Sequence, residues 1–291
     1  MRTRFAPSPT GPLHLGHAYS AMLAHDMAQA AGGEFLLRIE DIDQTRARPE
    51  YEGQIYDDLH WLGLDWPRPV MRQSDRLSTY RRALSQLWAR GLIYPCTCTR
   101  RDISDALNAP QEGAAPTPHI GPDGPAYPGT CRKIPAADAP MPEQALRLNM
   151  ALALAVVTGR PMARPLEFTE QGAGPQGETE NINIDPQTLM NAGDIVLARR
   201  DFGTSYHLAV VLDDATQGIT HITRGNDLFD ATAIHILLQN LLGLATPVYH
   251  HHRLIRDENG KRLAKRDDAR AIAKYRADGE TKSEIRQRVG L

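Results

Sequence analysis

The chain has 291 residues, of which 41% are hydrophobic and 23% charged, and its formal net charge at pH 7 is −2. This length predicts one large α/β domain or two smaller ones. The longest apolar runs, such as residues 151–157, are too short to span a bilayer, so the sequence predicts no membrane helix. Because an expected strand follows residue 1 at once, we expect no signal peptide and a cytoplasmic location.

Charge is distributed unevenly along the chain. Residues 253–291 contain twelve basic and seven acidic residues, a net charge of +5, so the preceding residues carry −7. The nearly neutral total argues against indiscriminate binding of nucleic acid. The basic segment is compatible with docking of a phosphate backbone at one place and equally with a solvated helical tail. Charge alone does not decide between the two.

The N-terminal stretch predicts an anion site. A short strand is expected at residues 4–6, followed by a turn rich in Pro and Gly and by a helix over residues 16–31. Backbone N–H groups and the positive end of the dipole at such a helix N-terminus attract phosphate. His14 and His17 flank Gly16, which has no side chain to block a ligand, so both could donate to phosphate oxygens. The alternative is a turn with two surface histidines.

Acidic side chains follow the next expected strand. Residues 35–39 indicate a buried parallel strand, and Glu40, Asp41 and Asp43 come directly at its carboxyl end. Open α/β sheets bind ligands at this end of their strands. The alternative is that these acids start the next helix, which we expect near residues 49–62.

All three cysteines lie in one window of the sequence. Cys96 and Cys98 form a Cys-x-Cys pair, and Cys131 follows after residues 108–126, a segment dominated by Pro, Gly and Ala that we expect to be a flexible loop. In a reducing cytosol, clustered cysteines favour a metal over a disulfide. Zinc prefers four ligands, and His119 is the obvious fourth. The residues alone leave open a zinc site and a set of buried reduced thiols.

The second half of the chain alternates short apolar runs with turns. Residues 206–212 are continuously apolar and are predicted to form a buried parallel strand. Residues 219–225 alternate like a strand that has Arg224 at its carboxyl end, and a helix is expected over residues 230–242. Three consecutive histidines, residues 250–252, cannot all face one ion, so we predict no role for them.

The N-terminal stretch, RFAPSPTGPLHLGH at residues 4–17, closely resembles the first signature, or HIGH motif, of class I aminoacyl-tRNA synthetases. Its lead-in is similar to the glutamyl branch in particular. Residues 38–41 match a motif of that branch, and residues 201–214 and 219–228 resemble the second half of its nucleotide-binding fold. The resemblance covers nearly the whole chain. It implies an α/β fold with the Rossmann-like parallel sheet of class I synthetases and a zinc-bearing insertion.

The resemblance also implies the site residues. ATP would be bound by His14, Gly16, His17 and Lys265, and the two histidines and Lys265 would be catalytic. The residues implied for L-glutamate are Arg4, Phe5, Ala6, Pro7, Ser8, Glu40, Tyr206 and Arg224. This set suits glutamate, because two guanidinium groups can bind its two carboxylates and one acid can bind its ammonium. The alternatives are a buried tyrosine at 206 and a surface ion pair at 224.

Residues 262–266 occupy the place of the second class I signature, KMSKS, and Lys265 falls on its second lysine. A lysine there would neutralise charge on the departing pyrophosphate. Four positions depart from the pattern: Arg262, Leu263, Ala264 and Arg266. Charge is retained and a hydroxyl is lost. The alternative is a basic surface loop.

The cysteine window resembles the zinc module of short synthetase-like proteins that glutamylate queuosine. That module contains Cys-x-Cys and Tyr-x-x-x-Cys, which implies one structural Zn²⁺ bound by Cys96, Cys98, Tyr127 and Cys131, with Tyr127 in place of His119. About 25 residues follow the second signature, enough for one or two helices. Discriminating glutamyl-tRNA synthetases continue into an anticodon-binding domain, and we expect none here.

We therefore expect four segments. Residues 1–94 would form the first half of the catalytic domain and residues 95–190 the zinc-binding insertion. Residues 191–245 would form the second half, and residues 246–291 the signature loop and a short, basic helical tail.

The resemblance implies a monomeric ligase that activates glutamate with ATP and Mg²⁺. It would then transfer the glutamyl group to queuosine in the anticodon of tRNA(Asp). The alternatives are a compact glutamyl-tRNA synthetase that charges tRNA(Glu) and an inactive paralogue that acts as an RNA-binding module.

Overall fold

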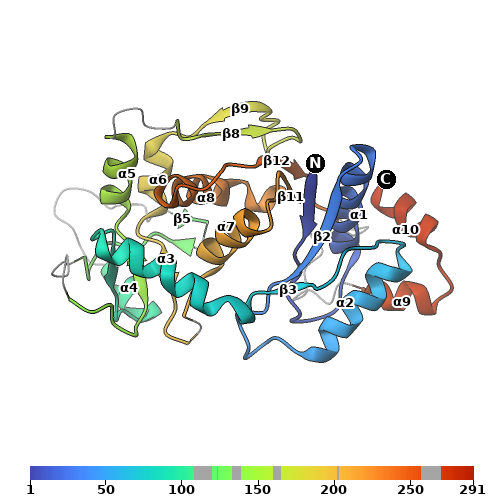
Figure 1. The fold of residues 1–291 in the computed structure, drawn as a ribbon, viewed down its shortest axis with the longest axis horizontal. Coiled ribbons are helices and arrows are strands. Elements are labelled where there is room, and N and C mark those ends of the chain that lie inside the picture. The colour runs from blue at the N-terminus through green and yellow to red at the C-terminus, as the bar shows by residue number, and fades with distance from the viewer. Residues whose placement is uncertain (108–119, 123, 133–138, 160–164, 202, 257–269) are drawn as a thin grey trace.

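A parallel three-stranded sheet forms the N-terminal part of the protein (Figure 1). The computed structural model describes residues 1–107, 120–122, 124–132, 139–159, 165–201, 203–256 and 270–291. The strands β1 (Arg2–Phe5), β2 (Glu34–Ile39) and β3 (Met71–Arg72) pair in parallel in that order. The parallel strand expected over residues 35–39 is therefore confirmed. Its apolar residues are buried between helices, which is why the run is nearly continuous.

Helices cover this sheet. They are α1 (Leu15–Ala30), α2 (Pro49–Trp61), α9 (Ile272–Ala277) and α10 (Lys282–Val289). Small buried residues, Ala18, Ala21, Ala24 and Ala28, let α1 lie close to the strands. The C-terminal helices pack into the same hydrophobic core through Ile272, Tyr275, Ile285 and Val289, and α10 contacts α1. The basic C-terminal helices are thus part of the folded body.

A second sheet has the order β11-β12-β8-β9. Its strands are β8 (Glu167–Glu170), β9 (Glu180–Asn183), β11 (His221–Gly225) and β12 (Val248–His252). The β11–β12 and β12–β8 pairs are parallel, whereas β8 and β9 form an antiparallel hairpin. The strand expected over residues 219–225 is confirmed. Strands β8 and β9 lie within the range 95–190 expected for the insertion, yet they belong to this sheet.

The two sheets meet at β1 and β11. The Thr220 N–H donates to the Arg2 carbonyl oxygen at 3.0 Å, and the Arg2 N–H donates to Thr220 Oγ1 at 2.8 Å. Figure 1 shows β1 and β11 side by side although they are far apart in sequence. The carboxyl ends of strands from both halves of the chain therefore lie at one edge.

The prediction of a strand over residues 206–212 is wrong, because these residues begin helix α7 (Tyr206–Thr216). Nearly every side chain of the run is buried, since α7 packs against α3 (Leu77–Ala89), α8 (Phe229–Leu242) and β10 (Val196–Ala198). A helix enclosed on all sides shows no polar face, so its 3.6-residue period is hidden in the sequence. The helix expected over residues 230–242 is confirmed as α8.

Antiparallel strands β4 (Ile93–Pro95) and β7 (Leu146–Leu148) pair with β10 in the order β10-β7-β4. Around them lie α4 (Arg100–Leu107), the short strands β5 (Ile120–Gly121) and β6 (Gly124–Pro125), α5 (Met150–Thr158) and α6 (Pro186–Ala192). Of the loop expected over residues 108–126, residues 108–119 and 123 lie outside the described residues. Among the helices that the structure describes, none is both long and apolar enough to cross a membrane.

Candidate functional site

A cavity of about 380 Å³ opens at the carboxyl ends of β1 and β11, beside the N-terminus of α1. Ligands of open α/β sheets bind at this position. The cavity wall brings together nine of the predicted site residues: Arg4, Phe5, Ala6, His14, Gly16, His17, Glu40, Tyr206 and Arg224. They come from segments up to 220 positions apart in the sequence.

Three predicted residues stand outside this wall. Ser8 lines an adjacent cavity of about 200 Å³ together with Glu40 and Tyr206. Pro7 is buried, and its carbonyl oxygen accepts a hydrogen bond from the Glu40 N–H at 3.0 Å. Lys265, like the rest of residues 257–269, lies outside the described residues.

His14 and His17 form a reciprocal cap at the start of α1. His14 Nδ1 accepts a hydrogen bond from the Gly16 N–H at 3.1 Å, and His17 Nδ1 accepts one from the His14 N–H at 3.2 Å. Because each Nδ1 is an acceptor, each neutral ring carries its proton on Nε2. A Cβ on Gly16 would lie 3.1 Å from His14 Cε1, so glycine permits this close packing. The helix N-terminus thus presents two N–H donors on rings that line the cavity.

A buried chain of charges runs beneath the cavity. Asp214 Oδ1 accepts hydrogen bonds from Arg4 Nε at 3.0 Å and from Arg38 Nη1 at 2.6 Å, and Arg38 Nη2 donates to Glu40 Oε1 at 3.0 Å. Burial opposes ionisation of Asp214, but the two arginines outweigh it and hold the pKa of Asp214 below its usual value. For Glu40 burial is the larger effect and raises the pKa. A cation in the cavity would therefore stabilise the Glu40 carboxylate.

Arg224 projects from β11 into a buried polar cluster. Its Nε donates to His251 Nε2 at 3.1 Å, its Nη1 donates to His235 Nδ1 at 3.0 Å, and its Nη2 donates to Thr232 Oγ1. The interpretation of histidines 250–252 as incidental did not foresee that His251 is buried on β12 next to Arg224. The alternative of a surface ion pair at Arg224 is excluded, because only 5% of this residue is exposed.

Tyr206 lies at the N-terminus of α7 and lines both cavities. Burial raises the pKa of its hydroxyl, so the phenol remains protonated and can donate a hydrogen bond. The prediction that Tyr206 reaches the pocket is compatible with this position, although the element that carries it is a helix.

A third cavity, of about 680 Å³, is lined by the segment after β2, the first half of α3, the segment that leads into β7 and the segment after β10. The exposed side chains of Arg199 and Arg200 line it, together with Arg81. Arg199 and Ile42 also line the 200 Å³ cavity, which in turn shares Glu40 and Tyr206 with the 380 Å³ cavity. The three cavities are therefore neighbours in a row, here called the trough, from an arginine-lined surface to the buried charges.

Sequence reasoning missed the residues that support the pocket, chiefly Arg38, Asp214 and His251. For Arg38 a signal existed: a charged residue within an otherwise apolar buried strand requires a partner. For Asp214 and His251 the partners lie 210 and 27 positions away, on Arg4 and Arg224, and no local pattern marks them.

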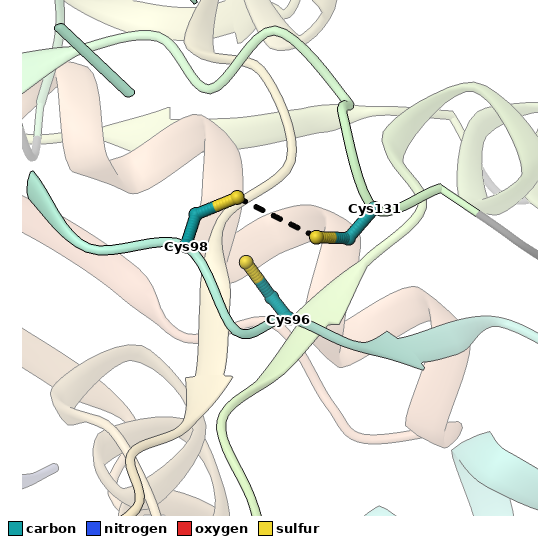
Figure 2. A group of neighbouring side chains, drawn as sticks. All are labelled: Cys96, Cys98 and Cys131. Atoms are coloured by element: carbon teal, nitrogen blue, oxygen red, sulfur yellow. Dashed lines mark hydrogen bonds between the residues drawn. The ribbon is translucent and has the colours of Figure 1, made fainter. Parts of the chain in front are cut away.

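The three cysteines converge as predicted (Figure 2). The sulfur atoms of Cys96, Cys98 and Cys131 all lie within 4.8 Å of one another, and those of Cys98 and Cys131 are 3.4 Å apart. Tetrahedral zinc with bonds of about 2.3 Å sets its sulfur ligands roughly 3.8 Å apart. The cluster is therefore a possible metal site. The alternative ligand His119 lies outside the described residues.

Tyr127 lies beside the three thiols, with its hydroxyl oxygen 3.4 Å from Cys98 Sγ. That oxygen also accepts a hydrogen bond from the Cys131 N–H at 2.8 Å. The Tyr127 hydroxyl lowers the pKa of Cys131 to about 6, whereas burial raises the pKa of Cys98. Arg147 lies over the Tyr127 ring at 3.9 Å and donates to Cys96 Sγ at 3.3 Å.

Known proteins are similar to this chain over all or nearly all of its length. The family described as tRNA synthetases class I (E and Q), catalytic domain, matches residues 1–291. A protein of Rhodobacter capsulatus named glutamyl-Q tRNA(Asp) synthetase is 62% identical over 294 residues, which cover 100% of both chains. A protein of the same name from Symbiobacterium thermophilum is 40% identical, over 95% of this chain and 81% of its own length.

Solved structures agree with the sequence comparison. A crystal structure of a glutamate tRNA ligase from Elizabethkingia meningosepticum, in complex with its amino acid, superposes with a TM-score of 0.68 at 28% identity. The match covers 92% of this chain and 52% of that one. One family accounts for the resemblance found at residues 4–17, 38–41, 201–214 and 219–228, for the α/β fold with its parallel sheet and for these matches. The chain belongs to the class I tRNA synthetases of the glutamate and glutamine type.

Proposed function

We propose that this protein activates L-glutamate with ATP and transfers the glutamyl group to queuosine in the anticodon of tRNA(Asp). One observation carries the first half of the proposal: a single cavity joins the paired histidines of the α1 N-terminus to Arg4, Glu40 and Arg224. The relatives named glutamyl-Q tRNA(Asp) synthetase support the acceptor. An inactive paralogue is disfavoured, because this chain contains the residues that the family resemblance assigns to the pocket.

The amino acid would occupy the side of the cavity that contains the buried charges. Arg4 and Arg224 would bind the two carboxylates of glutamate, and Glu40 would bind its ammonium group, whose charge offsets the effect of burial on that carboxylate. The Tyr206 hydroxyl would donate to the substrate, Phe5 and Ala6 would form part of the remaining wall, and Ser8 would contribute from the adjacent cavity. Pro7 would support Glu40 through its carbonyl oxygen. Glutamine would leave guanidinium charge unpaired, so the pocket should prefer glutamate.

ATP would lie against the N-terminus of α1. An oxygen of the glutamate α-carboxylate attacks the α-phosphorus, a new O–P bond forms and the bond to pyrophosphate breaks in line. No general base is needed, because the nucleophile is already ionised. The Nε2–H groups of His14 and His17 would stabilise charge on the phosphates, and Mg²⁺ would accompany ATP. Lys265 would act on the pyrophosphate side by its resemblance to the second signature.

The trough would admit the acceptor RNA. Arg81, Arg199 and Arg200 could contact its phosphates, which places a nucleoside near the activated glutamate. Cys96, Cys98, Cys131 and the Tyr127 oxygen would bind one structural Zn²⁺ and hold the insertion, within residues 95–190, against this trough. With these substrates the protein would act in the cytoplasm. We expect it to act as a monomer.

Transfer of labelled glutamate tests the proposal. The protein is incubated with ATP, labelled glutamate and one of three RNAs: tRNA(Asp) that contains queuosine, tRNA(Asp) that lacks it, and tRNA(Glu). We expect label on the first alone. Label on tRNA(Glu) alone would instead make the protein a compact glutamyl-tRNA synthetase, a possibility that its likeness to glutamate tRNA ligases favours as second candidate. The variant Arg224→Ala should abolish glutamate-dependent exchange of pyrophosphate into ATP, and normal exchange in this variant would contradict the assigned pocket.

A further inference from the structure

Behind Arg224, three adjacent strands supply a buried line of polar side chains. Arg224 comes from β11, His251 from β12 and Glu170 from β8. His251 and Glu170 are each 1% exposed. Among the described residues, the wall of the 380 Å³ cavity includes Arg224 but neither of the other two. Any effect of His251 and Glu170 on a ligand in this cavity therefore passes through Arg224.

The contacts fix where each proton lies. A guanidinium can only donate, so His251 Nε2, which lies 3.1 Å from Arg224 Nε, is an acceptor. The proton of the neutral imidazole is then on Nδ1, which donates to Glu170 Oε2. The arrangement allows only one tautomer of His251. Burial lowers the pKa of His251, which is consistent with a neutral ring.

The carboxylate of Glu170 is oriented in turn by the backbone. Its Oε1 accepts hydrogen bonds from the His251 N–H at 2.8 Å and from the Gly172 N–H at 2.7 Å. Oε2 is thereby directed at the imidazole. Burial opposes ionisation of Glu170, but the hydrogen bonds from His251 and Gly172 outweigh it and lower the pKa of Glu170. An ionised acceptor is therefore held at the end of the line.

We propose that Glu170 and His251 are positioning residues, which hold the Arg224 guanidinium in the orientation that binds a carboxylate of glutamate. The proposal rests on the proposed function of the pocket. Arg224 uses three of its five N–H groups on His251, His235 and Thr232. Of the contacts among described residues, this leaves one N–H on each terminal nitrogen, the pair that a carboxylate can accept bidentately. Without the line behind it, Arg224 could rotate and lose this alignment.

The variant Glu170→Gln tests the proposal because the backbone dictates how the amide must lie. The two N–H groups at the Oε1 position require the amide oxygen there, so the NH₂ group faces His251 Nδ1. An NH₂ donor forces the imidazole proton onto Nε2, where it opposes the Arg224 Nε–H. We expect the KM for glutamate in pyrophosphate exchange to rise at least about tenfold, the effect of one unsatisfied hydrogen bond to a charged group. The KM for ATP and kcat should change less than about threefold.

Glu167→Gln is the matched control. Glu167 lies on the same strand, but its side chain is exposed, so this variant should keep the wild-type KM for glutamate. A variant Glu170→Gln that activates glutamate with the wild-type KM would overturn the proposed positioning role of Glu170 and His251. So would equal rises in the KM for glutamate and for ATP, which would indicate a general structural effect.

A tautomer measurement separates this proposal from the proposed function. In ¹⁵N-histidine-labelled wild-type protein, the ring signals of His251, assigned by their loss in His251→Asn, should show the proton on Nδ1. In Glu170→Gln the proton should move to Nε2. A wild-type protein with the His251 proton on Nε2 would refute the proposed positioning role of Glu170 and His251. If the wild type shows the expected tautomer but neither binds nor activates glutamate, the proposed function fails while the hydrogen-bonded line itself stands.

Discussion

The amino-acid pocket and the thiol cluster are both built from ionisable side chains, but they are stabilised in different ways. In the pocket, Asp214 lies between the guanidinium groups of Arg4 and Arg38, and all three side chains are buried. In the thiol cluster, Cys98 and Cys131 are only partly buried, and their close neighbours are each other, Cys96 and Tyr127. In the pocket, side chains of the protein therefore supply the opposite charges.

The two regions therefore differ in what keeps their side chains in place. A buried carboxylate between two arginines is oriented by the folded chain before any ligand arrives. The three thiols contact Tyr127 and Arg147 but pack against only a small apolar group, which includes Tyr94 and Ile103, and a shared cation would hold all three together. We therefore expect changes in the pocket to affect the whole fold together with glutamate activation, and loss of metal to affect the insertion alone.

The largest effect should follow Asp214→Asn. This change leaves Arg4 and Arg38 buried without their carboxylate, and breaking a buried pair costs about 3–5 kcal/mol. We expect Tm to fall by roughly 10 °C in thermal unfolding and glutamate-dependent pyrophosphate exchange to drop at least about tenfold. Asp105→Asn is the control, because the Arg101–Asp105 ion pair is exposed and should contribute nothing measurable. Equal stability of the two variants would contradict the view that Asp214 organises the pocket.

Metal removal should have an intermediate and more local effect. Protein purified without chelator should contain one zinc ion per chain by elemental analysis, and Cys131→Ser should lose it, because two thiols and a phenol bind zinc weakly. We expect proteolysis to speed up selectively within residues 95–148, with transfer to tRNA impaired and pyrophosphate exchange within about twofold of wild type. Wild-type protein without zinc would refute the metal assignment, and loss of exchange together with zinc would show that the two regions are coupled.

The sequence predicted the walls of the pocket better than their support. Local patterns of spacing and polarity mark the Pro/Gly turn before α1, the strand that ends just before Glu40 and the converging cysteines. Each lies where its pattern predicts. The placement of Tyr206 on a strand was wrong, because a short apolar run cannot distinguish an enclosed helix from a buried strand. The link from Glu170 through His251 to Arg224 could not be predicted, because it depends on the strand order β11-β12-β8, in which β8, the first of the three strands in the sequence, lies beyond β12.

The smallest expected effect concerns Asp58, a buried carboxylate that has fewer stabilising contacts than Asp214. Asp58 lies on α2, 3% exposed, and its Oδ2 has no hydrogen-bond partner among the described residues. Burial raises the pKa of Asp58 to about 6, although Arg276 opposes the shift. The folded state therefore holds this proton more tightly than the unfolded chain, whose carboxyl has a pKa near the ordinary value of 3.8. Stability from this group is present at low pH and is lost as pH rises from about 4 through 6.

Asp58→Asn should consequently raise Tm at pH 7.5 by roughly 2–4 °C, and the gain should shrink toward zero near pH 4, where the wild-type carboxyl is protonated. Thermal unfolding of both proteins between pH 4 and 7.5 measures this directly. Asp57→Asn is the matched control, since its neighbouring carboxylate is exposed and should leave Tm unchanged at every pH. A gain that grew as pH fell would mean that the Asp58 carboxylate is stabilised in the fold as Asp214 is, and that burial without a bonded arginine suffices to hold a charge in this protein.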